Sequence, residues 1–185
     1  EGKELGLRQR YFLASASLQD AIRIWGRDHT ENHDYSQFAA EHVFQMNDTH
    51  PTIAVAELMR LLIDEKHLGW DQAWEITSQC MAYTNHTLLP EALERWPVHL
   101  FAKLLPRLLE IIYEINARFL RLVSMRWPGD TERQRRMSII EEGAERQVRM
   151  AWLAIVGSFS INGVAALHSE LLVKDLFHDF YELWP

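Results

Sequence analysis

Two short polar segments carry the side chains of this sequence that are best suited to chemistry. Residues 47–51 read Asn-Asp-Thr-His-Pro, and residues 85–97 contain an imidazole at His86 and carboxylates at Glu91 and Glu94. Each segment directly follows a short apolar run that is typical of a buried strand. Because the loops after parallel strands meet at one edge of a sheet, we expect both segments to build a single polar site.

A third segment, residues 157–163, breaks the helical period and predicts another short strand, which ends near Asn162. Strands that end at Asp48, His86 and Asn162 gather these side chains at one edge, next to helix N-termini that favour anionic or hydroxyl-rich ligands. A carbohydrate fits such a site. Two simpler interpretations stay open, since Asp48 is also a good N-cap ahead of Pro51, and His86 alone could be a packed, hydrogen-bonded histidine.

The two glutamates of the second segment allow a different chemistry. Glu91 and Glu94 are three residues apart, so on a helix they share one face, and paired carboxylates can act as acid and base in glycoside hydrolysis. A hydrolase would use either glutamate together with Asp48. The competing interpretation is an ion-pair network with Arg95, because the carboxylates of a glycosidase must stand apart with the sugar between them.

Other chemistries find little support in the sequence. His50, His86 and His168 lack the short ligand spacing of a zinc site. The stretch 157–163 is followed by no Lys-Ser or Lys-Thr pair, which a phosphate loop requires. Cys80 is the only cysteine, so neither an intrachain disulfide nor a thiolate metal cluster can form. We therefore predict no metal site.

The elements that must position these residues follow from the spacing of apolar side chains. That spacing predicts helices over residues 5–25, 53–63, 71–80, 100–122, 141–155 and 165–173, a helical turn between Pro90 and Pro97, and strands over 42–46, 81–84 and within 157–163. Residues 27–37 are polar and predict a surface loop. Pro106 should kink or split its helix. The sequence therefore indicates an α/β fold, mostly helical with a few short parallel strands.

Composition narrows the class of protein. The chain has 185 residues, 48% of them apolar, and a formal net charge of −7, which argues against a general affinity for nucleic acid or anionic membranes. Residues 118–149 are locally basic, but interleaved acids suit an exposed helix face. With one cysteine and no bilayer-spanning run, we expect a cytoplasmic protein. Because the chain begins at Glu1 and stops just after an apolar run, we expect residues 1–185 to be one partial domain of a longer protein.

Several motifs of this sequence have counterparts in one enzyme family. They are Asn-Asp-Thr-His-Pro at 47–51, Tyr-Thr-Asn-His-Thr at 83–87, Leu-Pro-Glu-Ala-Leu-Glu-Arg-Trp-Pro at 89–97, Ile-Tyr-Glu-Ile-Asn at 112–116, Arg-Met-Ser at 136–138, Glu-Glu-Gly-Ala at 141–144 and Ile-Asn-Gly-Val-Ala at 161–165. Through these motifs the sequence resembles the α-glucan phosphorylases, which include glycogen and maltodextrin phosphorylases. The resemblance covers nearly the whole chain, and the block at 83–97 is highly specific.

The resemblance implies a glycosyltransferase of the GT-B type, with two Rossmann-like domains and the active site between them. Such an enzyme releases glucose 1-phosphate, so its implied partners are an α-1,4-glucan (glycogen, starch or maltodextrin) and inorganic phosphate. Pyridoxal phosphate, held by a lysine of the second domain, supplies the proton relay through its phosphate group. The parent is expected to be a homodimer. As a segment of the first domain, this chain is expected to bind no pyridoxal phosphate and to be inactive alone.

The resemblance also implies roles for individual residues at the predicted sheet edge. His86 resembles the histidine that contacts the glucosyl residue at the cleavage subsite, and it is the expected catalytic residue. The residues that resemble the lining of the sugar pocket are Asp48, His50, Glu94, Asn162 and Val164. This assignment agrees with the argument from the strand ends.

A second set of residues resembles a remote polysaccharide storage site on helices. It consists of Tyr113, Asn116, Ser138, Glu142 and Arg146. Ala117 replaces a glutamine that is usual there, which implies altered affinity. Ile24 follows Arg23 where nucleotide-regulated members carry two arginines, which implies a less regulated enzyme. Two alternatives to a phosphorylase segment remain, a stand-alone oligosaccharide-binding module on this surface and the hydrolase described above.

Overall fold

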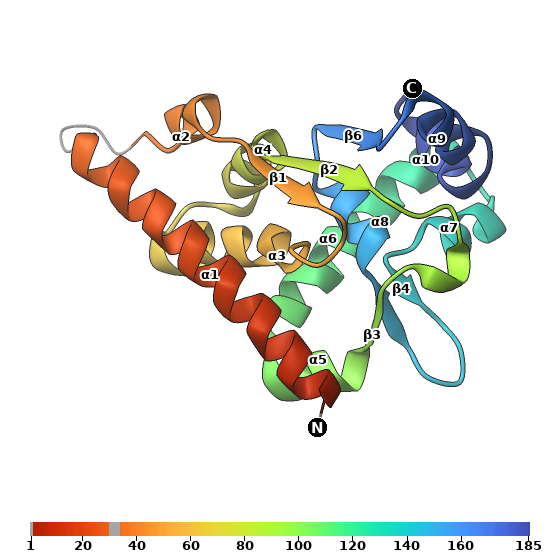
Figure 1. The fold of residues 1–185 in the computed structure, drawn as a ribbon, viewed down its shortest axis with the longest axis horizontal. Coiled ribbons are helices and arrows are strands. Elements are labelled where there is room, and N and C mark those ends of the chain that lie inside the picture. Colours follow the sequence, from red (N-terminus) through yellow and green to blue (C-terminus); the bar gives the residue numbers. More distant parts are fainter. Residues whose placement is uncertain (1, 30–33) are drawn as a thin grey trace.

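The computed structural model describes residues 2–29 and 34–185. One long helix, α1 (Gly2–Asp28), runs along one flank of the molecule, and the sheet and the other helices lie beside it (Figure 1). The helix continues past Gly26, beyond the end that its apolar spacing predicts. Trp25 explains this extension, because its buried ring packs against Tyr35 and Phe38 and anchors the last turn.

Three parallel strands form the central sheet. β1 (Phe44–Asn47), β2 (Met81–Asn85) and β6 (Ser160–Gly163) pair in the order β1-β2-β6. In register, Thr84 lies between Asn47 and Asn162, so the carboxyl ends of all three strands share one edge. The prediction of an α/β fold with a few short parallel strands is confirmed.

Apolar helices cover one face of this sheet. α3 (Ile53–Arg60) is buried from its first to its penultimate residue, and α8 (Met150–Val156) is buried throughout. Both lie beneath the strands in Figure 1. α8 is apolar all round, as expected of a core helix. α3 also buries one carboxylate, Glu57, which Ser15 and Arg60 bond. The π-helical turn η1 (Leu61–Glu65) extends α3, and α4 (Trp70–Cys80) leads into β2.

Two segments that the sequence predicts as helical form a second, antiparallel sheet instead. Its strands are β3 (Arg95–Pro97), β5 (Gln147–Arg149) and β4 (Ile140–Glu141), in the order β3-β5-β4. Only a 3₁₀ turn, η2 (Pro90–Ala92), remains of the helical turn predicted between Pro90 and Pro97. The predicted helix over residues 141–155 is likewise wrong in its first half, because Val148 belongs to a strand and only α8 is helical.

The remaining helices build the other side of the core. α5 (Val98–Leu104) and α6 (Pro106–Arg126) are separate helices, so the predicted break at Pro106 is confirmed. α7 (Thr131–Met137) begins at an N-cap, Asp130, whose side chain accepts a hydrogen bond from the Arg133 backbone. The chain ends with α9 (Ala166–Leu171), the π-helical turn η3 (Leu172–Leu176) and α10 (His178–Leu183).

The polar segment at residues 27–37 is only partly a loop. The short helix α2 (Ser36–Glu41) begins inside it, and residues 30–33 lie outside the described part of the chain. Over residues 2–29 and 34–185, no helix is long and apolar enough to cross a bilayer.

Candidate functional site

The carboxyl edge of the parallel sheet is tied together by side chains from all three strands. Gln45 Nε2 donates to Thr84 Oγ1 at 2.9 Å, and Thr84 Oγ1 donates to Asn162 Oδ1 at 2.9 Å. We call the edge formed by residues 47–50, 84–87 and 162–164 the rim. Asp48, His86 and Asn162, which lie far apart in the sequence, are therefore neighbours on one surface, as the strand argument requires.

His86 is an exposed side chain of the rim that a hydrogen bond orients. Its Nε2 lies 2.5 Å from Asn47 Oδ1, across the β1–β2 pair. An amide oxygen only accepts, so Nε2 carries the proton, and in the neutral ring Nδ1 remains free to accept a hydrogen bond. His86 is therefore not a buried packing histidine. Its open nitrogen can receive a hydroxyl of a ligand lying over the rim.

Asp48 sits at the point where β1 turns toward α3. Its φ of 65° lies in the left-handed region, which only a few non-glycine residues adopt. Its backbone N–H donates to Thr84 O at 2.9 Å, and its Oδ1 accepts from Thr49 N at 2.7 Å. Asp48 is not the helix N-cap of the simpler interpretation, because Thr52 occupies that position of α3. His50 lies exposed in the same turn.

A buried amide that the sequence analysis does not single out fixes the loop after β2. Asn85 is fully buried, and its Nδ2 donates to Tyr83 Oη at 3.0 Å. Its Oδ1 accepts from Thr87 N at 3.0 Å and lies 3.0 Å from His168 Nε2, which joins the loop to α9. Burial raises the pKa of Tyr83 to about 12, so the phenol stays protonated. The contact between Asn85 and His168 spans 83 residues of sequence, and no motif near either residue predicts it.

Close packing at the end of β6 orients the third part of the rim. A Cβ atom at Gly163 would lie 2.3 Å from His168 Cδ2 and 3.0 Å from the backbone nitrogen of Ser169. Gly163 N also donates to Ser169 Oγ at 3.0 Å. Only glycine allows this approach, which leaves Asn162 and Val164 exposed on either side.

Glu94 lies beneath the rim with both carboxylate oxygens engaged. Oε2 accepts from Thr49 Oγ1 at 3.2 Å, and Oε1 accepts from Trp96 Nε1 at 2.5 Å. Arg10 Nε of α1 lies 3.4 Å from Oε1. Glu91, by contrast, is exposed in η2, so the two glutamates do not share a helix face, and that prediction is wrong. Glu94 thus joins α1, β3 and the turn after β1.

The predicted storage-site residues lie partly together. Tyr113, Asn116, Ser138 and Glu142 line a cavity of about 440 Å³ between α6 and α7, and Ala117 lines it too. Asn116 and Ser138 are buried and bonded to each other at 3.0 Å, and Ile139 N donates to Asn116 Oδ1 at 2.8 Å. These two residues therefore shape the cavity floor, whereas Tyr113 and Glu142 can face a ligand.

Arg146 does not line this cavity. It lies in the exposed turn before β5, where its carbonyl accepts from Val98 N at 2.9 Å. Two of the histidines considered for zinc have other partners, because His86 and His168 each contact an asparagine amide. Among the residues that the structure describes, no group of three His, Cys, Asp or Glu side chains could hold a metal ion.

Comparison with known sequences relates this chain to one protein family. A sequence model of the carbohydrate phosphorylase family matches residues 1–185. The chain is 59% identical over 185 residues to a glycogen phosphorylase of Synechocystis sp., 55% over 191 to the muscle form of Oryctolagus cuniculus and 54% over 191 to that of Homo sapiens. Each comparison covers the whole chain but only 21%, 22% and 23% of the respective relative, so the chain spans about a fifth of their length.

Proposed function

Because the chain belongs to the carbohydrate phosphorylase family, we propose that its rim forms one wall of the glucose-binding site of an α-1,4-glucan phosphorylase. The complete enzyme uses inorganic phosphate to cleave the terminal α-1,4 bond of glycogen, starch or maltodextrin and releases glucose 1-phosphate. The relatives named as glycogen phosphorylases support this reaction. We also propose that residues 1–185 are part of one catalytic domain, and that the parent is a cytoplasmic homodimer.

The observation that carries the proposal is the hydrogen bond between His86 and Asn47 at 2.5 Å. It fixes the imidazole at the carboxyl edge of a parallel sheet, where ligands of open α/β sheets bind. In the neutral ring, Nδ1 accepts a hydrogen bond from a glucosyl hydroxyl. Asp48 and Asn162 add a carboxylate and an amide within the same rim, and both residues suit polyol recognition. Glu94 supports the rim from beneath through Thr49.

The cofactor that the family resemblance implies requires residues this rim does not provide. Pyridoxal phosphate is held through a lysine, and the four lysines of the sequence are Lys3, Lys66, Lys103 and Lys174. They belong to α1, the end of η1, α5 and η3, and none is a rim residue. The described residues therefore do not fit cofactor attachment at this edge. We propose that another part of the parent polypeptide carries the cofactor.

The direct test measures phosphorolysis by the full-length polypeptide that contains this chain. With maltodextrin and phosphate, His86→Ala should lower kcat/KM by about 100-fold, because a contact at the reacting sugar is lost. His99→Ala is the matched control, since His99 is 71% exposed on α5 and pairs with Glu145 away from the rim. Equal rates for both variants would refute the proposed role of His86.

Two further measurements separate this function from its alternatives. The 185-residue chain alone, incubated with maltodextrin and phosphate, should form no glucose 1-phosphate, since the cofactor is absent. Steady formation of that product would contradict the proposal. Release of glucose or maltose in phosphate-free buffer would instead indicate a hydrolase, which the engaged carboxylate of Glu94 disfavours.

A second candidate function, glucan binding without catalysis, is favoured by the cavity at Tyr113. Calorimetry with maltoheptaose tests it. Glu142→Ala should weaken binding about tenfold by removing an exposed acceptor, whereas Arg146→Ala should change it less than twofold because Arg146 lies outside the lining. The opposite order would show that the ligand lies over the β4–β5 turn instead.

A further inference from the structure

A buried arginine without a carboxylate partner lies away from the rim, at the end of β5. Arg149 is 9% exposed and takes part in none of the ion pairs among the described residues. The carboxylate whose charge acts on it, Glu141, is paired with Arg95 at 2.8 Å. Burial lowers its pKa to about 10, so it remains charged at neutral pH. A buried cation without a counter-charge costs several kcal/mol of desolvation, and proteins usually balance that cost with an opposite charge.

Backbone carbonyls satisfy only part of this guanidinium. Arg149 Nε donates to Ser138 O at 3.0 Å, and Nη2 donates to Arg135 O at 3.0 Å and Arg136 O at 2.9 Å, which closes the end of α7. Its Cζ lies 4.6 Å from the centroid of the Trp152 ring. Nη1 donates to none of the described residues, and it is not among the fully buried polar atoms that lack a partner. Nη1 therefore keeps some accessible surface at which solvent or a ligand can contact it.

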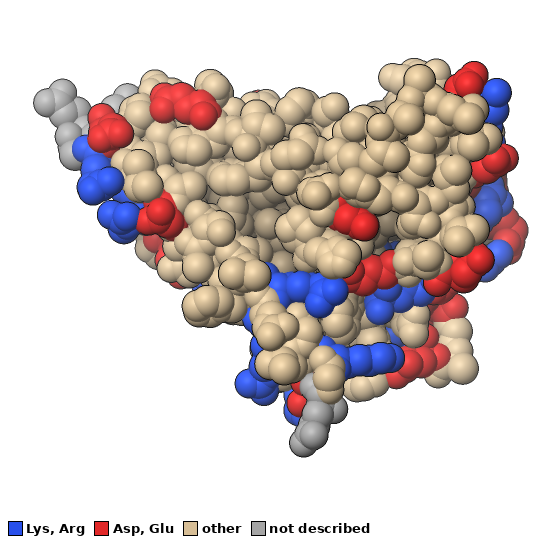
Figure 2. Space-filling view, in the orientation of Figure 1, with Lys and Arg blue, Asp and Glu red and all other residues tan. Residues whose placement is uncertain are grey.

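Arg149 lines a cavity of about 640 Å³ between α7, η3 and α10. Its lining includes four cations, Arg135, Arg136, Arg149 and Lys174, but only two carboxylates, Asp175 and Asp179. Arg136 is already paired with Asp179 at 2.9 and 3.0 Å. Counting Lys, Arg, Asp and Glu alone, the lining carries a formal excess of two positive charges. Arg135 and Lys174 also pair with Glu132 at 3.0 Å and Glu170 at 3.6 Å, outside the lining, but all four side chains are more than 60% exposed, so these pairs are weak. Figure 2 shows the charged side chains that gather at this margin of the molecule, over α7 and α10.

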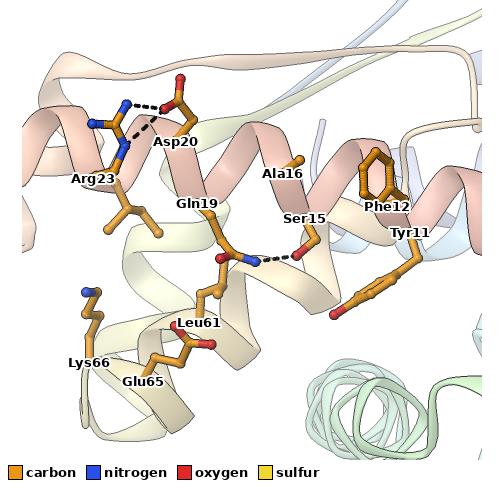
Figure 3. A pocket seen from close by; sticks show the side chains of 11 residues that line it. Tyr11, Phe12, Ser15, Ala16, Gln19, Asp20, Arg23, Leu61, Glu65 and Lys66 are labelled. Carbon is orange, nitrogen blue, oxygen red and sulfur yellow. Dashed lines mark hydrogen bonds and ion pairs between the residues drawn. The ribbon is translucent and has the colours of Figure 1, made fainter.

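A second cavity has no such excess of positive charge in its lining. The space between α1 and η1 is lined by Asp20, Arg23, Glu65 and Lys66, two charges of each sign. In Figure 3, Arg23 is bonded to Asp20 and Gln19 to Ser15 along α1. Its charges cancel, and it gives no reason to expect a charged ligand.

We propose that the cavity lined by Arg149, Arg135 and Lys174 binds the phosphoryl group of inorganic phosphate or of a sugar phosphate. A phosphate monoester carries between −1.5 and −2 charges at neutral pH, which matches the excess of the lining. Guanidinium groups bind its oxygens with charge-assisted hydrogen bonds. The apolar walls, which include Leu88, Pro90 and Phe180, leave room for the sugar of a monoester. This site is separate from the rim and does not depend on the proposed reaction.

The test follows side-chain resonances of the 185-residue chain by NMR at constant ionic strength. The Arg149 Nε–H and the Trp152 indole N–H, which donates to Arg136 O at 2.7 Å, report on this cavity and on no rim residue. Titration with inorganic phosphate and with glucose 6-phosphate should shift both signals in a saturable way. Tighter binding of the sugar phosphate would identify a monoester site, and equal binding a free-phosphate site.

Two neighbouring residues of opposite charge are substituted so that the test leaves Arg149 unchanged. Removal of Arg149 itself could unfold the end of α7. Lys174→Gln should weaken binding and Asp175→Asn should strengthen it, each about twofold to fivefold, because both residues line the cavity and are exposed. Lys66→Gln removes the same charge at the other cavity and should leave the affinity unchanged. The proposal fails if neither signal saturates, if chloride shifts them equally, or if Lys66→Gln and Lys174→Gln act alike.

Discussion

The rim of the parallel sheet and the cavity between α7 and α10 are both polar, but different forces hold them. In the rim, neutral hydrogen bonds join side chains from separate strands, as in the pair His86 and Asn47. Around the cavity, ion pairs join helices, as between Arg136 and Asp179. Neutral hydrogen bonds depend on close geometry and little on salt concentration or pH. Ion pairs between exposed groups are weakened by added salt and by protonation of the carboxylate at low pH.

This difference suggests what each region can do. The rim contacts are short, directional and anchored in buried groups such as Asn85, so they can hold a neutral ligand such as a sugar in one orientation. The cavity at Arg149 attracts charge over a longer range and tolerates more variation in position. Four substitutions test this contrast, and they follow in order of decreasing expected effect.

The rim should be most sensitive to crowding at Gly163. Gly163→Ala should destabilise the fold by about 2 to 3 kcal/mol, because its new Cβ meets His168 and the Ser169 backbone, which cannot both move away. Gly143→Ala is the control, since a Cβ there has no neighbour within 4 Å, and it should change stability by less than about 0.5 kcal/mol. Urea unfolding measures both. Similar values would mean that the end of β6 is looser than its contacts indicate.

Removal of the buried amide of the rim should have the next largest effect. Asn85→Ala leaves Tyr83, Thr87 and His168 without their shared partner and should cost about 2 kcal/mol. Asn116→Ala also removes a buried amide with two hydrogen bonds, so a similar loss is expected. The two variants should differ in the NMR signals of His86, which only Asn85→Ala should shift. A shift in both variants would contradict the independence of the rim.

The sequence predicts the rim well because its signals are local. A short apolar run followed by Asn-Asp-Thr-His-Pro or Asn-His-Thr indicates a strand and its turn, and parallel pairing then brings the turns together. The β4–β5 hairpin has no such signal. Val148, Trp152 and Ile155 follow the spacing of a helix, yet Val148 lies in a strand and the other two lie in α8. Strands of two or three residues are too short to establish an alternating pattern.

The buried polar contacts escape prediction for a different reason. Asn85 and His168 are 83 residues apart, and nothing near either residue indicates the other. Arg149 belongs to a basic stretch that resembles an exposed helix face in sequence, but it is the last residue of strand β5 and is buried against Trp152. Charge patterning assumes a continuous helix, and that assumption fails where the helix is absent.

The ion pairs around the cavity should have a moderate and pH-dependent effect. Hydrogen bonds from Arg136, with the charges of Arg136 and Arg133, hold the pKa of Asp179 below its usual value. A carboxyl with a lowered pKa in the folded state stabilises the fold above its unfolded pKa, near 3.9, and this contribution is lost as pH falls through the folded pKa. Asp179→Asn should therefore cost about 1 kcal/mol at pH 7 and progressively less as pH falls below about 4, as thermal unfolding across this range can measure. A cost that does not fall with pH would assign the effect to packing.

Removal of an exposed ion pair on α1 should have the smallest effect on stability. Its comparison with Asp179→Asn tests whether burial strengthens an ion pair. Arg23 and Asp20 are bonded at 2.5 Å, but both side chains are more than half exposed, whereas Asp179 is 19% exposed. Asp20→Asn should change stability by less than about 0.5 kcal/mol at pH 7, because water and salt screen the pair. If Asp20→Asn costs as much as Asp179→Asn, burial adds nothing to the ion pairs of this protein. The excess charge at Arg149 would then be solvated as well, and the cavity would have no electrostatic preference for a phosphoryl group.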